Sequence, residues 1–151
     1  TYNGYGMRKF QRDRADEVNG KFYSCPLIRL PEIYLNIAEA MNELGKATTK
    51  DEFGNDAYDY INMVRNRVNM PDLTTAKAAP GRELREAIRH ERRVELGLEF
   101  DRFYDLVRWG IAKEVLQAAG KNYQDKNALL PLPQTEIDKS KGVLVQNPDY
   151  Q

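Results

Sequence analysis

The residues whose types could support catalysis are concentrated between Arg82 and Gly110, in the stretch RELREAIRHERRVELGLEFDRFYDLVRWG. His90 is the only histidine of the chain, and Glu91 follows it directly. On a helix these two side chains point about 100° apart. The sequence HERRVE also lacks the H-E-x-x-H spacing that a zinc-binding helix requires. We therefore predict neither a metal site nor a general base at His90.

Glu91 and Glu95 are the second candidate, because two carboxylates one helical turn apart could divide the roles of general acid and general base. Glycoside hydrolases, however, place their two carboxylates across a cleft, about 5 to 9.5 Å apart, with the sugar between them. On a helical plot both glutamates fall instead within an apolar face formed by Leu84, Ala87, Ile88, Val94 and Leu98. A carboxylate on a packed face needs a cationic partner. We interpret both glutamates as structural.

The cationic partners are expected from a preceding helix, because the arginines of the same helix lie on its other side. Arg65 and Arg67 flank the apolar stripe of that preceding helix, and either could reach the two glutamates. The sequence therefore predicts a structural ion-pair network of Glu91, Glu95, Arg65 and Arg67. We predict no catalytic residue, metal ligand or cofactor, since the chain contains no phosphate-binding loop, nucleophile elbow, CxxC pair or EF-hand pattern.

Helical periodicity predicts the elements that position these residues. A first helix begins near Pro31 in PLIRLPEIYLNIAEAMNELGK and stops at Gly45. A second helix has Asn55 as its N-cap and ends at Pro71, with an apolar face of Ala57, Ile61, Val64 and Val68. The helix that carries both glutamates follows and bends or breaks at Gly97, and IAKEVLQAAG forms a further short helix. The first two helices resemble a tetratricopeptide unit, although their spacing is wider than the repeat of about 34 residues.

The two ends of the chain are expected to be irregular. Residues 1–26 form a weakly extended arm whose aromatic residues could stack on a sugar, but packing onto the helices is favoured. These aromatic residues are Tyr2, Tyr5, Phe10, Phe22 and Tyr23. Trp109, Phe103 and Tyr104 also have the composition of a sugar-stacking surface, but their helical spacing favours the core. The stretch LLPLPQTEIDKSKGVLVQNPDYQ is predicted to be a proline-rich tail with one turn at QTEID, packed on the body through Leu129, Leu130 and Leu132.

Length and composition are those of an ordinary globular chain, with 41% hydrophobic and 30% charged residues, and we expect a single domain over residues 1–151. The formal net charge of zero gives no electrostatic basis for binding nucleic acid or an anionic membrane. No apolar run approaches the roughly 18 residues of a transmembrane helix. Cys25 is the single cysteine, which excludes an intrachain disulfide. Because the first residue is Thr1, we expect a fragment of a longer protein.

Four segments occur in the order PLIRLPEIYLNIAEAMNELG, AYDYINMVRNRVNMPDL, LREAIRHERRVELGLEFDRFYDLVRWG and LLPLPQTEID. Together they resemble the C-terminal region of the SusD/RagB family of outer-membrane nutrient-binding lipoproteins, from about Tyr5 to Tyr150. The most specific part is I-x-x-E-R-R-x-E-L followed by R-F-x-D-L-x-R-W-G, here Ile88 to Gly110, with L-P-x-P downstream. The chain departs from the family at Phe100, where a glycine often follows the second glutamate.

The resemblance implies a largely helical fold with tetratricopeptide-like helix pairs, on a protein that is lipid-anchored at the surface of the bacterial outer membrane. It implies non-catalytic capture of glycans or oligosaccharides for import through a SusC-like TonB-dependent transporter. The lipidated cysteine would lie outside this chain. Ligand contacts in the family come largely from variable loops, so no ligand-binding residue is assigned here, and the glycan stays open. The alternative hypothesis is a tetratricopeptide-like scaffold for protein–protein interaction. An enzyme of carbohydrate metabolism would need a pocket with convergent carboxylates, which the sequence does not offer.

Overall fold

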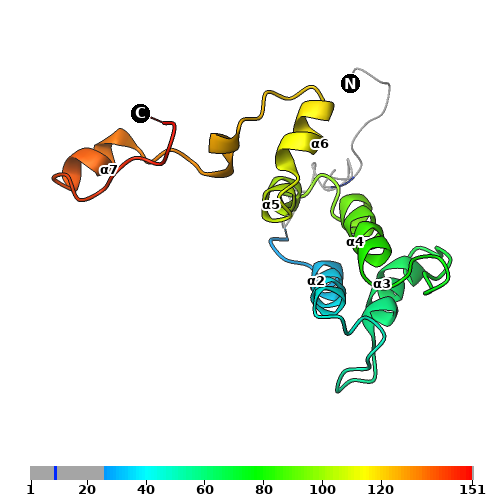
Figure 1. The fold of residues 1–151 in the computed structure, drawn as a ribbon. Helices are drawn as coiled ribbons and strands as arrows, with labels where there is room; N and C mark the ends of the chain where they lie inside the picture. Colours follow the sequence, from blue (N-terminus) through cyan, green and yellow to red (C-terminus); the bar gives the residue numbers. More distant parts are fainter. Residues whose placement is uncertain (1–8, 10–25, 151) are drawn as a thin grey trace, which may run out of the picture. The chain divides into compact units, whose positions relative to one another are not determined.

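The computed structural model describes Lys9 and residues 26–150. Its helices are α2 (Leu30–Glu43), α3 (Ala57–Asn66), α4 (Arg82–Glu95), α5 (Asp101–Arg108), α6 (Ala112–Ala118), the 3₁₀ helix η1 (Asp125–Ala128) and α7 (Gln134–Lys139), as Figure 1 shows. The described residues contain no strand, which confirms the mainly α-helical fold class. None of the helices among them is both long enough and apolar enough to span a membrane. The predicted aromatic arm at residues 1–26 lies outside the described residues, apart from Lys9 and Pro26.

The chain falls into two compact units, Thr1–Glu99 and Phe100–Gln151. The single domain expected over residues 1–151 stays a prediction. The first unit holds α2, α3 and α4, and the second holds α5, α6, η1 and α7.

In the first unit, α2 and α3 pack on one another as the tetratricopeptide-like helix pair that the sequence predicts (Figure 1). Pro31 lies in the first turn of α2, and Gly45 follows the end of that helix with a φ of 69°, a backbone conformation that favours glycine. Ala38 of α2 and Ala57 of α3 are both fully buried. The core contains Leu35, Ala38, Ala47, Ala57, Tyr58, Tyr60, Ile61, Val64, Leu84 and Ile88.

The bounds of α3 differ from the prediction at both ends. Its N-cap is Asp56, whose carboxylate accepts two N–H groups of the first turn. The predicted N-cap, Asn55, instead donates its N–H to a side chain of the preceding loop. The helix ends at Asn66, earlier than expected, because the chain turns at Asn69 with a φ of 57°. Val68 is therefore exposed outside the helix.

α4 packs on both α2 and α3, with Leu84 and Ile88 fully buried. Val94, which was expected on this apolar face, is 64% exposed. The buried face of α4 includes Arg92, whose guanidinium donates to the Asn36 side chain of α2. Val94 lies about 200° around the helix from Arg92, at the opposite edge of this face.

The break predicted at Gly97 is present, because α4 ends at Glu95 and α5 begins at Asp101. Leu98 was expected to continue the apolar face of α4. It lies beyond the end of the helix with a φ of 67°, and its side chain is exposed. The apolar face of α4 is therefore shorter than the sequence pattern indicates.

The second unit has a small core of its own, in which Leu106, Ala112 and Tyr123 are buried and Phe103 and Trp109 pack against them. The core position predicted for Phe103 and Trp109 is confirmed. The Phe103 and Tyr123 rings meet edge to face at a centroid distance of 6.3 Å.

Two further aromatic residues of this unit are exposed, and one of them, Tyr104, was expected in the core. Tyr104 lies two residues before the buried Leu106, which places it about 200° around the helix from the core. Phe100 lies at the N-cap of α5, before the helix begins, and its side chain is 74% exposed.

The C-terminal segment contains α7 at the predicted QTEID turn. Residues 146–150 are joined to residues 129–132 by bonds between side chains and the backbone. The amide of Gln146 donates to the carbonyl oxygen of Leu132 at 2.9 Å and accepts the Leu132 N–H at 2.8 Å. The amide of Asn147 donates to the carbonyl oxygen of Leu130 at 2.6 Å.

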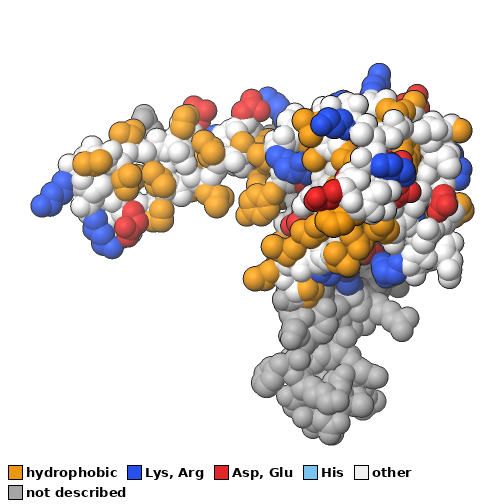
Figure 2. Space-filling model, turned by 90° about the horizontal axis from the view of Figure 1, so that it is seen from below, with side chains coloured by type: hydrophobic (Ala, Val, Ile, Leu, Met, Phe, Trp, Pro, Cys, Tyr) orange, Lys and Arg blue, Asp and Glu red, His pale blue; other side chains and the backbone are white. Residues whose placement is uncertain are grey.

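The predicted packing of this tail on the body through its leucines is wrong for Leu129 and Leu130, both of which are exposed. Their carbonyl groups are bound by the returning segment, and this leaves the side chains at the surface. Figure 2 shows hydrophobic side chains at the surface of this segment, on the left of the view. The exposed large hydrophobic residues of the segment are Leu129, Leu130, Val143, Leu144 and Val145.

Candidate functional site

The four charged residues that the sequence singles out lie where α3 and α4 meet. Arg65 of α3 donates to the Oε2 atom of Glu91 of α4 at 2.7 Å, and its Nε donates to a backbone carbonyl oxygen at 2.9 Å. Arg67, directly after α3, donates to Oε2 of Glu95 at 2.8 Å. Glu91 is 8% exposed, so its ion pair is largely removed from water. The structure thus brings each glutamate to one of these two arginines.

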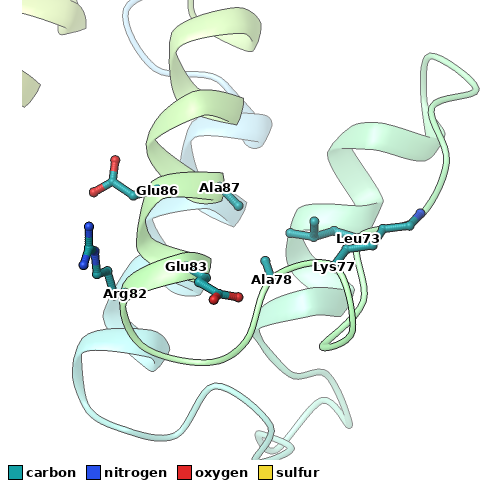
Figure 3. A pocket seen from close by; sticks show the side chains of 7 residues that line it. All are labelled: Leu73, Lys77, Ala78, Arg82, Glu83, Glu86 and Ala87. Atoms are coloured by element: carbon teal, nitrogen blue, oxygen red, sulfur yellow. The ribbon is translucent and has the colours of Figure 1, made fainter.

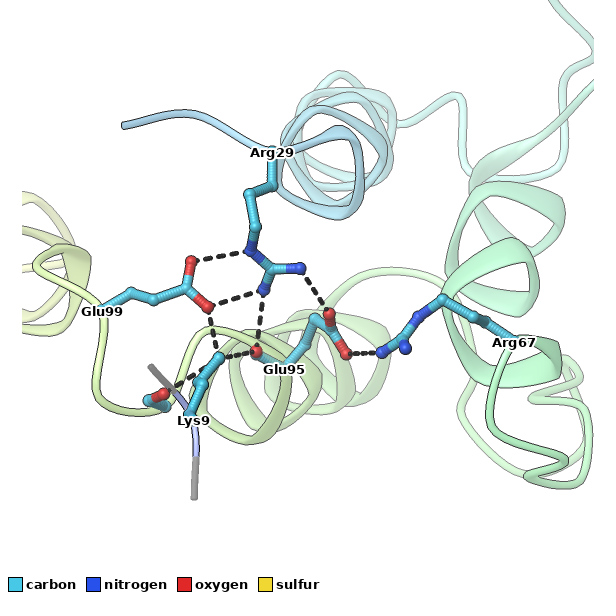
Figure 4. A network of polar contacts seen from close by, with 6 residues as sticks. Lys9, Arg29, Arg67, Glu95 and Glu99 are labelled. Carbon is cyan, nitrogen blue, oxygen red and sulfur yellow. Dashed lines mark hydrogen bonds and ion pairs between the residues drawn. The ribbon is translucent and has the colours of Figure 1, made fainter. Parts of the chain in front are cut away.

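Three further residues extend this ion-pair network, and none of them was singled out from the sequence. Arg29, directly before α2, donates to both carboxylate oxygens of Glu99, at 2.9 and 2.7 Å, and to Oε1 of Glu95 at 3.1 Å (Figure 4). Lys9 forms an ion pair with Glu99 and donates to the backbone carbonyl oxygen of Glu95 at 2.8 Å. Glu95 therefore lies between Arg29 on one side and Arg67 on the other, as Figure 4 shows.

Two opposing effects act on the Glu99 carboxyl group. Burial is the larger single influence and would raise its pKa. Hydrogen bonds from Arg29 and Lys9, together with their charges, outweigh burial and lower the pKa of Glu99. The hydrogen bond to Glu99 is also the main cause that raises the pKa of Arg29. A carboxylate with a lowered pKa and both oxygens engaged is a poor proton acceptor. The geometry therefore favours a structural role for the network.

A metal centre finds no support in the part of the chain that the structure describes. Within residues 26–150 and at Lys9, no group of three or more His, Cys, Asp or Glu side chains is placed to hold a metal ion. His90 is exposed on α4. The two glutamates nearest to it in the sequence, Glu91 and Glu86, form ion pairs with Arg65 and Arg89.

A pocket of about 520 Å³ lies between residues 73–78 and the first turns of α4 (Figure 3). Leu73, Ala78 and Ala87 supply its apolar lining. Its charged side chains do not converge: Arg82 lies on the side opposite to Lys77, which points away from the pocket (Figure 3). Small-molecule sites have a few polar groups that converge on the ligand. The pocket therefore lacks the arrangement expected of such a site.

A second pocket of about 460 Å³ adjoins the ion-pair network. Two of its lining residues, Arg29 and Arg67, are the arginines that bind Glu95. The remaining lining is mainly apolar and consists of Leu30, Pro31, Tyr34, Met63 and Val64. Because the network fixes both arginines, the position of this pocket depends on the packing of α2 and α3 against the end of α4.

The model of the SusD family matches residues 1–150. This chain belongs to the SusD family. SusD-like protein P2 of Formosa agariphila is 32% identical over 144 residues, which cover 87% of this chain and 27% of that protein. The resemblance inferred from the four sequence segments is thereby confirmed.

Solved structures of SusD-like proteins show the same helical arrangement. A laminarin binding SusD-like protein matches with a TM-score of 0.61 and 36% identity, covering 82% of this chain and 23% of that chain. The surface glycan-binding protein A from Bacteroides thetaiotaomicron matches with a TM-score of 0.56 and 32% identity, covering 81% of this chain and 24% of that chain. This SusD-family chain therefore spans about a quarter of the length of these relatives.

Proposed function

We propose that this chain takes part in the non-catalytic capture of glycans or oligosaccharides at the bacterial cell surface, for import through a SusC-like TonB-dependent transporter. The observation that carries the proposal is the SusD-family match over residues 1–150, together with relatives named as a laminarin binding protein and a surface glycan-binding protein. Attachment to the outer membrane through a lipid anchor is part of the same proposal.

The geometry of the charged residues supports binding without catalysis. Glu91 and Glu95 each bind an arginine, and Glu95 uses both of its carboxylate oxygens in ion pairs. A glycosidase needs one carboxyl group free to give a proton and a second free to attack or to activate water. The ion pairs of these two glutamates instead join α4 to α3 and to the residue before α2.

Affinity gel electrophoresis tests the glycan part of the proposal. The 151-residue chain is run through gels that contain laminarin, a starch-type glucan or a mucin-type glycan, with albumin as the non-binding reference. Retardation in at least one gel, without release of reducing sugar, is the expected result. Migration like albumin in every gel would contradict glycan capture by this chain, and release of sugar would contradict the absence of catalysis.

A scaffold for protein–protein interaction is the alternative, and the largely apolar pocket beside Tyr34 and Met63 is the observation that favours it. Chemical crosslinking in native outer membranes separates the two functions. Crosslinks from this chain to a TonB-dependent transporter support the import proposal. Crosslinks to other proteins alone, combined with no glycan binding in the gels, would favour the scaffold.

A further inference from the structure

The loop between α2 and α3 presents a phenylalanine to solvent. Phe53 lies in this connection, which covers residues 44–56, and its side chain is 76% exposed. Its neighbours in the chain are polar or lack a side chain: Glu52 and Gly54 flank it, and Thr48 and Thr49 are exposed earlier in the same loop. An isolated exposed apolar side chain is common on protein surfaces. The backbone that carries Phe53, however, is held in place by several hydrogen bonds.

Asp51 fixes the backbone on both sides of the ring. One oxygen of its carboxylate accepts the N–H groups of Phe53 at 2.9 Å and of Asn55 at 3.0 Å. The other oxygen accepts the hydroxyl of Tyr60, a buried residue of α3, at 2.5 Å. These bonds, first of all that from the Tyr60 hydroxyl, lower the pKa of Asp51.

Backbone bonds close the same loop. The Asp51 N–H donates to the carbonyl oxygen of Asn55 at 2.8 Å, and the Gly54 N–H donates to the carbonyl oxygen of Asp51 at 3.0 Å. Gly54 takes a φ of 79°, which a residue with a side chain rarely adopts. The loop is also tied to α3, because Lys50 forms ion pairs with Asp56 and with a carboxylate of the first turn. The backbone that carries the ring is therefore held in place before any ligand arrives, which reduces the entropy lost on binding.

We infer that Phe53 is a sugar-contact residue, whose ring stacks on the apolar face of a pyranose in an oligosaccharide ligand. The inference rests on the proposed function, which supplies glycans as the class of ligand. An aromatic face carries partial negative charge, and the C–H groups of a pyranose face carry partial positive charge, so the two attract one another. The same loop carries the exposed residues Thr48, Thr49 and Glu52, whose hydroxyl and carboxylate groups can form hydrogen bonds with sugar hydroxyl groups. A protein partner would require a wider apolar surface around an aromatic anchor.

The test compares variants of the 151-residue chain for binding to laminarin, with a starch-type glucan as the second probe. Phe53→Ala is expected to weaken binding about three- to tenfold, the loss of one aromatic stacking contact. Phe53→Trp is expected to retain or improve binding, because it keeps a ring at the same place. Phe100→Ala is the matched control: that phenylalanine is 74% exposed, close to the 76% of Phe53, but lies in the second unit. Its binding should equal that of the unaltered chain.

The outcomes distinguish the two proposals. If the unaltered chain binds a glucan and Phe53→Ala binds it equally well, the inference about Phe53 is wrong and the proposed function stands. Equal losses in Phe53→Ala and Phe100→Ala would indicate unspecific apolar contact and would also overturn the inference. No binding by the unaltered chain would overturn both. Thermal unfolding of each variant checks that the fold is intact, which is expected because both rings are exposed.

Discussion

The side-chain amide of Asn42 and the backbone of Gly81 exchange two hydrogen bonds across 39 residues of sequence. The Asn42 Nδ2 donates to the Gly81 carbonyl oxygen at 2.9 Å, and the Gly81 N–H donates to Asn42 Oδ1 at 2.7 Å. Asn42 is buried in α2, and Gly81 is the N-cap of α4 with a φ of 91°. The same exchange joins Asn62 to Leu73. A side-chain amide therefore fixes the loop end at which α4 begins.

Replacing Asn42 by alanine is expected to lower the free energy of unfolding by about 2–3 kcal/mol, since two bonds are lost and the Gly81 N–H and carbonyl groups lose a buried partner. Asn42→Asp keeps the acceptor but places a carboxylate beside the Gly81 carbonyl oxygen, so it should be no more stable than the alanine variant. Urea denaturation followed by circular dichroism measures both. Asn66→Ala, at an exposed asparagine of α3, is the control and should change stability by less than about 0.5 kcal/mol.

Loss of the Arg65–Glu91 ion pair is expected to lower the free energy of unfolding strongly. Glu91→Ala leaves the Arg65 guanidinium without its carboxylate in a largely buried position and should cost about 3 kcal/mol or more. The matched control is Glu43→Ala, which removes the partner of Arg85 in an exposed pair with bonds of 2.6 Å, and should cost less than about 1 kcal/mol. Equal melting temperatures for Glu91→Ala and the unaltered chain would refute the prediction.

Acid should weaken the ion-pair network through Glu99. The folded-state pKa of Glu99 is lowered from its ordinary value of 4.5, so its contribution to stability is present above pH 4.5 and is lost as the pH falls through the lowered value. At pH 7 we expect Glu99→Gln to melt at a lower temperature than the unaltered chain. As the pH falls below 4.5, the melting temperatures of Glu99→Gln and of the unaltered chain should converge. A difference that stays constant over this range would show that Glu99 does not carry the effect.

The tail should open when Gln146 loses its amide. Gln146→Ala removes both bonds to Leu132, so the segment after α7 is expected to be cleaved by trypsin about five to ten times faster, as the loss of roughly 1 to 1.5 kcal/mol of local stability predicts. Gln134→Ala removes only an exposed bond within α7, to Asp138, and serves as the control. Mass spectrometry of the fragments over time makes the comparison. Identical cleavage rates in the two variants would argue against a role for the Gln146 bonds.

The helices, and the charged residues that pair between α3 and α4, could be predicted from the sequence. Helical periodicity shows on which face of its own helix each of these residues lies. Arg65, Arg67 and the two glutamates could be placed by helical periodicity and by the need of a buried carboxylate for a cation. Arg29 could not be found this way. It lies outside the periodic pattern, directly before α2, and only the fold brings it beside Glu99.

The exposed apolar residues mark a second limit of the sequence pattern. Val94 has the right type and nearly the right position for the core, yet Arg92 and its bond to Asn36 shift the buried face away from it. Periodicity predicts which face of a helix is apolar. It does not predict which edge of that face a neighbouring helix covers. Amide groups that bind distant backbone, such as that of Asn42, leave no local pattern at all.

The bonds of Arg29 span 70 residues to Glu99 and 66 residues to Glu95. Closing a loop of this length costs chain entropy before the ion pairs form, whereas α2 and α3 meet across a short connection. The helix pair should therefore form early in folding and the contacts of Arg29 late. Interactions absent from the folding transition state mainly slow unfolding. The arginine before α2 thus sets how long the folded unit lasts more than how quickly it forms.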